Sequence, residues 1–273
     1  MATSLLILTD FFQAANRALN YATRLAGPLC ARLVLLHVRR DSVLDAEMFT
    51  GQLSNLSKEA IQLALSSLSE GLTVPVVAEV GHGRVAFAVA DAVSRHHPAL
   101  IVLGRSDYSG TPDELVQTTS LDILRTSPYP MLVVPHNLAT TTTTPRRVLL
   151  AVDGEEFTLS EHAGSIRHLL TALHVELTVL HVAPEAGHPE TVAQALNSVL
   201  QTGLAIDLPP VYSRAVVNNS PAEGILAAAT PTDFDLVMLI ARPRSVLGHL
   251  FHHSVTAQVL LHSSLPVLVL PAE

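Results

Sequence analysis

Residues 99–135 read ALIVLGRSDYSGTPDELVQTTSLDILRTSPYPMLVVP, and residues 235–271 read DLVMLIARPRSVLGHLFHHSVTAQVLLHSSLPVLVLP. Each stretch contains an apolar run, a polar loop, a segment with apolar residues at helical spacing, and a second apolar run. Short apolar runs bounded by turn residues are typical of buried strands. Each stretch therefore predicts the order strand, loop, helix, strand.

The two stretches keep a constant register. Pro135 and Pro271 are 136 positions apart, and Pro130 and Pro266 have the same separation. A constant separation means that neither copy has an insertion within the stretch. We therefore interpret the two stretches as copies of one structural unit.

Earlier parts of the chain repeat as well. Residues 6–10 match residues 149–153 at a separation of 143, and residues 33–38 match residues 177–182 at a separation of 144. Differences in loop length between two copies of one domain would produce this drift. The repeats therefore extend over nearly the whole chain.

The repeats divide the chain into two domains, at residues 1–138 and 146–273. Residues 139–145 form the predicted linker, because they hold five consecutive threonines and show no apolar periodicity. Half of a 273-residue chain is long enough to bury a core of its own. Any function must therefore be considered for each half separately.

Strand-like and helix-like segments alternate in both halves. This alternation implies right-handed crossovers and a five-stranded parallel sheet in each half, with helices on both faces, which is an α/β architecture. We expect strands at residues 5–8, 33–38, 74–80, 99–104, 131–135, 148–152, 177–182, 212–217, 236–240 and 267–270, and helices at residues 13–25, 54–68, 85–93, from 119, 159–173, 190–204, 221–229 and 255–262.

The composition argues against several classes of protein. A net charge of -8 without a run of Lys or Arg argues against nucleic-acid binding. No apolar run approaches the roughly 18 residues of a membrane span, and the amino-terminal residues do not form a secretory signal. We therefore expect a cytoplasmic protein. The single cysteine, Cys30, excludes an internal disulfide, and we expect it to be a small buried hydrophobe.

Several segments, in their order and spacing, resemble the universal stress protein family in its tandem form. They are Val-Asp-Gly at residues 152–154, Leu-x-x-Leu-His-Val at 33–38 and 177–182, Ser-Pro-Ala-Glu-Gly-Ile at 220–225, Asp-Leu-Val-Met at 235–238 and Leu-Pro-Val-Leu-Val at 265–269. The resemblance implies two tandem Rossmann-like domains of the adenine nucleotide alpha hydrolase-like fold. It also implies that the last strands of the two halves pair about a pseudo-twofold axis, and it leaves a further homodimer open.

The resemblance implies that any bound ATP would lie at the carboxyl ends of the strands, where ligands of open parallel sheets bind. The residues that it assigns to such a site are Asp10, Val38, Gly104, Arg105, Thr118 and Thr119 in the first half and Asp153, Val182 and Ser254 in the second half.

The glycine pattern of ATP-binding family members, GxxG followed by nine residues and Gly-Ser or Gly-Thr, is degenerate in both halves. Glycines let the backbone approach phosphate oxygens. Only Gly104 remains in the first half, where Asp107 occupies the second glycine position, and the second half has Ile240 and Pro243 there. An acid repels phosphate, and proline has no N–H to donate. The pattern therefore argues against an intact phosphate cradle.

Other interpretations of these residues stay open. Four arginines, at positions 84, 105, 242 and 244, lie where side chains could hold an anion instead of the backbone. Asp10 and Asp153 could face a helix amino terminus, and Thr118 and Ser254 could cap helices.

The histidines give weaker signals. Residues 249, 252 and 253 are histidines whose spacing makes a metal site conceivable, but solvated loop histidines are the preferred interpretation. His37 and His181 are expected to be partly buried structural residues. No metal site is therefore predicted.

The chain has no GxSxG, GxxxxGK[ST] or HExxH motif and no nucleophile with an evident base, so we expect no enzyme activity. The leading hypothesis is a regulator in stress adaptation that binds a ligand or a partner. One alternative is an ATP-binding signalling protein that uses its first half. The other is a protein that binds an apolar ligand in a cavity between the halves.

Overall fold

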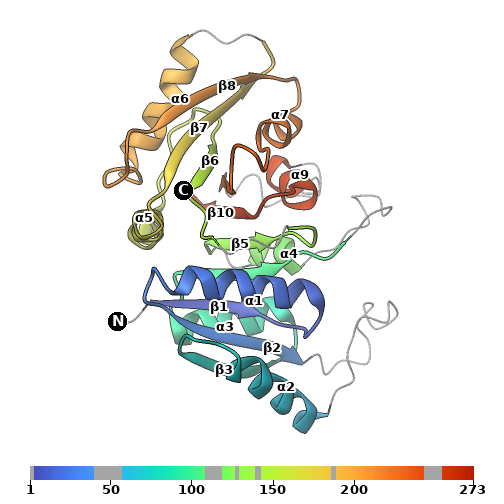
Figure 1. The fold of residues 1–273 in the computed structure, drawn as a ribbon. Helices are drawn as coiled ribbons and strands as arrows, with labels where there is room; N and C mark the ends of the chain where they lie inside the picture. The colour runs from blue at the N-terminus through green and yellow to red at the C-terminus, as the bar shows by residue number, and fades with distance from the viewer. Residues whose placement is uncertain are drawn as a thin grey trace.

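A computed structural model gives the fold and describes residues 3–39, 57–107, 119–126, 129–138, 143–185, 189–242 and 254–273. Strands and helices alternate in both halves, as predicted (Figure 1). The elements of the first half are β1 (Ser4–Leu8), α1 (Gln13–Ala26), β2 (Arg32–Arg39), α2 (Lys58–Glu70), β3 (Val76–His82), α3 (Val85–His96), β4 (Leu100–Gly104), α4 (Thr119–Thr126) and β5 (Met131–Val134).

The second half repeats this order. Its elements are β6 (Arg147–Ala151), the 3-10 turn η3 (Ser160–His162), α5 (Ala163–Ala172), β7 (Glu176–Ala183), α6 (Pro189–Gln201), β8 (Tyr212–Val217), α7 (Pro221–Ala228), β9 (Leu236–Ala241), α9 (Val255–His262) and β10 (Val267–Pro271).

The described strands form one sheet in the order β3-β2-β1-β4-β5-β10-β9-β6-β7-β8. Neighbouring strands within each half are parallel. The halves meet through an antiparallel pair, in which Val267, Leu268 and Val269 of β10 lie opposite Val133, Leu132 and Met131 of β5. The α/β fold class and the predicted pairing of the last strands are therefore confirmed.

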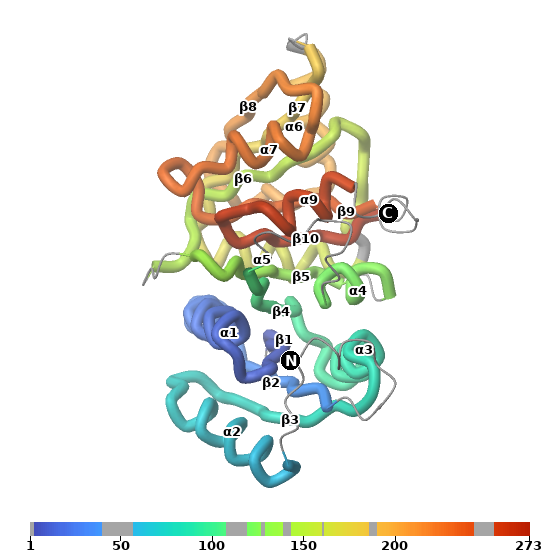
Figure 2. The backbone as a smooth tube through the Cα atoms, turned by 90° about the vertical axis from the view of Figure 1, so that its right-hand side faces the viewer, coloured from blue at the N-terminus to red at the C-terminus, as the bar shows by residue number. Residues whose placement is uncertain are grey.

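Helices cover both faces of this sheet. Residues of α1, α2, α5 and α6 belong to one buried apolar cluster, and residues of α3, α4, α7 and α9 belong to the other. Figure 2 shows α1 and α3 on opposite sides of the first-half strands. Alternate residues of a strand face opposite sides, so Leu5 and Ile7 pack in the first cluster and Leu6 packs in the second. The central strands are therefore continuous apolar runs.

Some element boundaries differ from the predicted ones. The helix expected at residues 54–68 begins at Lys58, where Ser57 accepts a hydrogen bond from the N–H of Ala60, and residues 54–56 lie outside the described part. The helix expected at residues 159–173 consists of η3 followed by α5. No helix in the described ranges combines the length and apolar composition that a membrane span requires.

The expectation for Cys30 was wrong, because this side chain is exposed. Cys30 lies in the turn between α1 and β2 with a φ of 47°, and its N–H donates to the carbonyl of Gly27 at 3.0 Å. The neighbouring Leu29 and Ala31 point into the core instead. Because both neighbours face the core, this turn directs the Cys30 side chain to solvent.

Arg105 joins the two halves beyond the strand pair. This side chain is 8% exposed; its Nη1 donates to the carbonyl of Leu260 and its Nη2 to the carbonyl of Ser263, both at 2.7 Å. These carbonyls lie at the end of α9, where the last carbonyls of a helix have no partner within the helix. The matching position in the second half is Ala241, 136 residues later, so this arginine contact has no counterpart there.

Arg105→Met should lower the free energy of unfolding by about 3 kcal/mol. The substitution keeps an apolar stem but leaves two buried carbonyls without their charged donor, and hydrogen bonds from charged groups contribute about 1.5–3 kcal/mol each. Urea denaturation of the purified chain measures the loss. The control is Arg84→Met, at an exposed position, and a loss no larger than that of the control would contradict the assignment.

Asp235 forms hydrogen bonds between the start of β9 and the start of β6. Its Oδ2 accepts from the backbone N–H groups of Arg146 at 3.0 Å and Arg147 at 2.9 Å, and its Oδ1 accepts from Nη2 of Arg147 at 2.6 Å. Burial raises the pKa of Asp235, but the hydrogen bonds from Arg147 and Arg146 outweigh it, so the pKa lies below its usual value of 3.8. Ionised Asp235 therefore stabilises the fold.

Because this pKa is lower in the folded chain, the stabilisation is present above the unfolded pKa and is lost as pH falls through the folded pKa. Asp235→Asn should therefore be less stable than the wild type at pH 7, and the difference should shrink below about pH 4. Urea titrations at several pH values test this expectation. Asp233→Asn, at an exposed neighbour, should show no comparable narrowing.

Candidate functional site

The carboxyl ends of β1 and β6 carry the two acids that the sequence assigns to the site. Oδ1 of Asp10 accepts the N–H of Phe12 at 2.9 Å, and Oδ1 of Asp153 accepts the N–H of Glu155 at 3.1 Å. Both acids thus close the same short turn, in which an aspartate bonds the backbone two residues later. Each carboxylate already has a structural partner in its own half.

The residue after each acid has a positive φ, 68° at Phe11 and 86° at Gly154. This conformation is strained for a bulky residue and easy for glycine. The Phe11 ring stacks on the His37 ring, with centroids 4.6 Å apart and planes 30° apart. A Cβ added to Gly154 would instead lie 3.8 Å from Cε1 of His181. Of these two turns, only the one in the first half therefore covers its strand-end histidine with an aromatic ring.

Both strand-end histidines bond to the preceding strand. Nδ1 of His37 lies 2.9 Å from the carbonyl oxygen of Thr9, and Nδ1 of His181 lies 3.3 Å from that of Val152. A carbonyl only accepts, so Nδ1 carries the donated proton. His181 is partly buried as predicted, whereas His37 is more deeply buried than predicted.

The valines that follow these histidines pack against helices. Val38 and Val182 are partly buried at the ends of β2 and β7. A Cβ on Gly224 would lie 2.5 Å from Cγ1 of Val182, so α7 can approach β7 this closely only with glycine at that position. The sequence pattern places Gly224 in the Ser-Pro-Ala-Glu-Gly helix start, but this packing role depends on a contact with β7 that the pattern does not reveal.

Gly104 allows a close approach of α1. A Cβ at this position would lie 2.1 Å from the carbonyl oxygen and 2.3 Å from the carbonyl carbon of Ala14. Those distances are impossible for real atoms, so the backbone of α1 rests directly on the end of β4. The missing side chain of this glycine is therefore needed for helix packing, whether or not a ligand binds.

Gly104→Ala should lower the free energy of unfolding by about 3 kcal/mol, the upper part of the usual range for overpacking. The added methyl meets backbone atoms of α1, which cannot move aside as a flexible side chain can. Thermal or urea unfolding measures the effect. Gly27→Ala is the matched control, because its added Cβ meets nothing within 4 Å and its φ is -58°. Equal stability of the two variants would contradict this packing role.

The hydroxyl and arginine residues predicted for the site have different roles in the structure. Ser254 caps α9, since its Oγ accepts the N–H of Ala257 at 3.1 Å, and Thr119 is the first residue of α4. Arg105 lies in the contact with α9 described above, and Arg84 is exposed at the start of α3. Thr118, Pro243, Arg244 and the histidines at 249, 252 and 253 lie outside the described residues.

Asp107, at the second glycine position of the degenerate pattern, also has a neighbour of its own. Its Oδ1 lies 3.7 Å from Nε2 of His136, which follows β5. In the part of the chain that the structure describes, no group of three His, Cys, Asp or Glu side chains could hold a metal ion.

In the second half, Arg242 bridges the carboxyl ends of β9 and β6. Its Nη2 donates at 3.0 Å both to Oδ1 of Asp153 and to the carbonyl of Glu155, and its Nη1 donates at 2.9 Å to the carbonyl of Glu156. The arginine side chain is 14% exposed. The structure thus brings together two residues that the sequence had considered separately, a carboxylate and a cation.

A hollow of about 360 Å³ adjoins this bridge. Gly154 and Glu156 line it from the β6 turn, and Glu190 lines it from α6. Two carboxylates repel a triphosphate at short range unless a cation intervenes. The lining of this hollow therefore favours a neutral or cationic group over a phosphate.

The joined parallel sheets and their strand-end turns define a tandem Rossmann-like protein of the adenine nucleotide alpha hydrolase-like class. The Universal stress protein family model matches residues 1–135 and 144–271. The chain therefore belongs to the universal stress protein family and carries two copies of the family domain. The sequence matches no curated protein.

Solved structures share this fold over nearly the full chain. A universal stress protein from Archaeoglobus fulgidus DSM 4304 is 18% identical, covers 98% of both chains and has a TM-score of 0.72. A Pseudomonas aeruginosa UCBPP-PA14 protein described as a universal stress protein is 18% identical, covers 99% of this chain and 94% of that chain, and has a TM-score of 0.62.

The same fold occurs outside stress proteins. The cytoplasmic domain of a prokaryotic cation chloride cotransporter is 12% identical, covers 100% of this chain and 95% of that chain, and has a TM-score of 0.54. At these identities the likeness shows the fold alone.

Proposed function

We propose that this chain acts in stress adaptation as a regulator that binds a ligand or a partner without catalysing a reaction. We further propose that neither half depends on ATP for this role. The proposal combines two observations. The chain belongs to the family, and its two strand-end sites lack the glycine pattern of the nucleotide-binding members.

The bridge between Arg242 and Asp153 carries this proposal. The Asp153 side chain is half exposed, but its Oδ1 accepts from Arg242 as well as from the N–H of Glu155, so a nucleotide would have to compete with the arginine for this oxygen. Arg242 in turn donates to two carbonyls of the same turn. The protein thus supplies a cation of its own to the acid at the end of β6.

The first half supports the proposal through different residues. Phe11 stacks on His37 at the ends of β1 and β2, and the Arg105 guanidinium contacts α9 from the other half. Each of these side chains has a packing or bonding role in the folded chain. A nucleotide at this position would have to displace the Phe11 ring or bind beside it.

Protein purified without added nucleotide should carry no adenine nucleotide, and ATP with Mg²⁺ should not raise its melting temperature. Mass spectrometry of the denatured protein and thermal unfolding measure these two properties. Nucleotide binding would overturn the proposal, and a pair of variants would then locate it. Loss in Asp10→Ala with retention in Asp153→Ala would establish the competing hypothesis of ATP-dependent signalling by the first half.

Arg242→Ala should lower the free energy of unfolding by about 1–2 kcal/mol, because three hydrogen bonds from a charged group are lost at a partly exposed site. It should also leave the chain unable to bind ATP, since removing the arginine restores no glycine. Urea denaturation and the same ATP titration measure both effects. Arg214→Ala, at an exposed position of β8, is the matched control and should be close to the wild type in stability.

A further inference from the structure

Equivalent backbone hydrogen bonds show which positions of the two halves correspond. The N–H of Ala31 donates to the carbonyl of Ala26, and 144 positions later the N–H of Val175 donates to that of Leu170. The separations of 143 for the first strand and 136 for the fourth strand are matched in the same way. Positions around the contact between the halves can therefore be compared directly.

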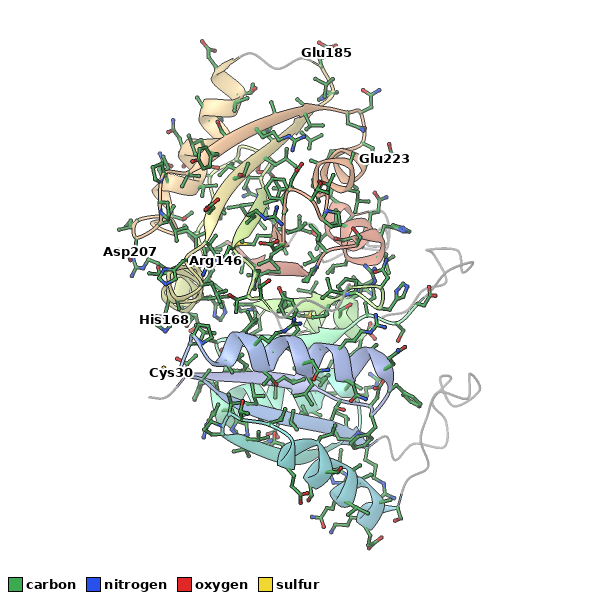
Figure 3. The ribbon with its side chains drawn as sticks, in the orientation of Figure 1. Cys30, Arg146, His168, Glu185, Asp207 and Glu223 are labelled. Atoms are coloured by element: carbon green, nitrogen blue, oxygen red, sulfur yellow. The ribbon has the colours of Figure 1, made fainter. Side chains whose placement is uncertain are left out.

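A groove of about 210 Å³ lies between the halves, at the amino ends of β1 and β4. It is distant in the sheet from the carboxyl ends that the family uses. In Figure 3 the labels of His168 on α5 and of Cys30 in the turn before β2 lie close together and mark this end of the strands. The lining residues are Thr3, Leu5, Leu29, Ala99, Leu100, Gly164, Ser165, His168 and Leu169.

The groove has an apolar floor and a polar rim. Four buried leucines, at positions 5, 29, 100 and 169, supply the floor. Ser165 and His168 are exposed at the rim, and Thr3 adds a second hydroxyl. A molecule from solvent could therefore reach the floor directly, and its polar group would meet neutral donors and acceptors.

On the pseudosymmetric side of the molecule, the matching position is filled by a tyrosine. Tyr21 on α1 corresponds to Ser165 on α5, at the separation of 144. Tyr21 is only 4% exposed, and Asp235 of the second half is among the charges that act on it. The Tyr21 ring therefore lies at the contact between the halves.

At other matching positions, too, the residue beside the groove is smaller than its counterpart on the filled side. Ala99 corresponds to Asp235, and Thr3 corresponds to Arg146, whose N–H contacts that aspartate. Smaller residues thus line the groove at each of these points. The Arg24 guanidinium lies 5.2 Å from the centre of the Tyr21 ring, and its counterpart at the groove is His168.

We propose that this groove binds a small single-ring aromatic molecule with a polar substituent, such as a phenol. The ring of the ligand takes the place that the Tyr21 ring takes on the other side. His168 lies beside the ring as Arg24 does beside Tyr21, and the Thr3 hydroxyl bonds the substituent.

The size of the groove supports this class of ligand. Apolar cavities of about 150 Å³ accept benzene, so about 210 Å³ accommodates one substituted ring. A nucleoside triphosphate or a long acyl chain exceeds this volume. This proposal is independent of the function proposed for the strand-end sites, because it uses different residues at the opposite ends of the strands of the first half.

The probe for the test is 4-methylphenol, the analogue of a tyrosine side chain, titrated into the ¹⁵N-labelled full chain. The amide signals of Gly164, Ser165 and Ala99 should shift saturably with one site per chain. The signals of Asn20, Tyr21 and Asp235, at the matching positions of the filled side, should not shift. This comparison within the wild-type protein needs no variant.

Ser165→Tyr should place a ring in the groove and weaken 4-methylphenol binding at least tenfold, without lowering the melting temperature. Ser94→Tyr, at an exposed position of α3, should bind as the wild type does. Absence of saturable shifts at the groove, or equal shifts on both sides, would overturn the proposal. Equal affinity for 1-hexanol would overturn the aromatic class of ligand.

Discussion

The antiparallel contact between β5 and β10 determines how the rest of the molecule is built. Three register pairs join two parallel sheets into one, and they cover the backbone edges that each half would otherwise expose. The apolar clusters on the two faces then contain residues from both halves. Each apolar cluster therefore needs residues of both halves, so the stability of each half depends on the other.

Within this symmetric frame, the side chains at the contact have diverged. Arg105 bonds the last carbonyls of α9, but the matching residue in the other half is Ala241. Tyr21 fills one side of the contact, whereas Ser165 leaves a groove on the other. A duplicated backbone tolerates these differences because each site has its own neighbours, and a change in one copy does not act on the other.

The two strand-end turns show the same divergence. Their backbones share an aspartate bonded two residues ahead and a left-handed residue after it. One turn then stacks Phe11 on His37, and the other has Gly154 and an arginine bridge. The turn geometry is thus retained while the groups offered to a ligand change, which is why family membership alone does not identify a ligand.

The sequence by itself determined the duplication, the parallel sheets and the positions of most helices and strands, because apolar periodicity and turn residues are local properties. It also indicated the acids and arginines of the strand-end sites. It did not indicate that Arg242 meets Asp153, that Arg105 reaches α9, or that Gly104 supports α1. Only the tertiary structure decided these contacts, since each joins residues far apart in the chain whose distance depends on how helices rest on the sheet. The exposure of Cys30 and the groove beside Ser165 were decided at the same level, because burial depends on which neighbours a folded backbone brings near.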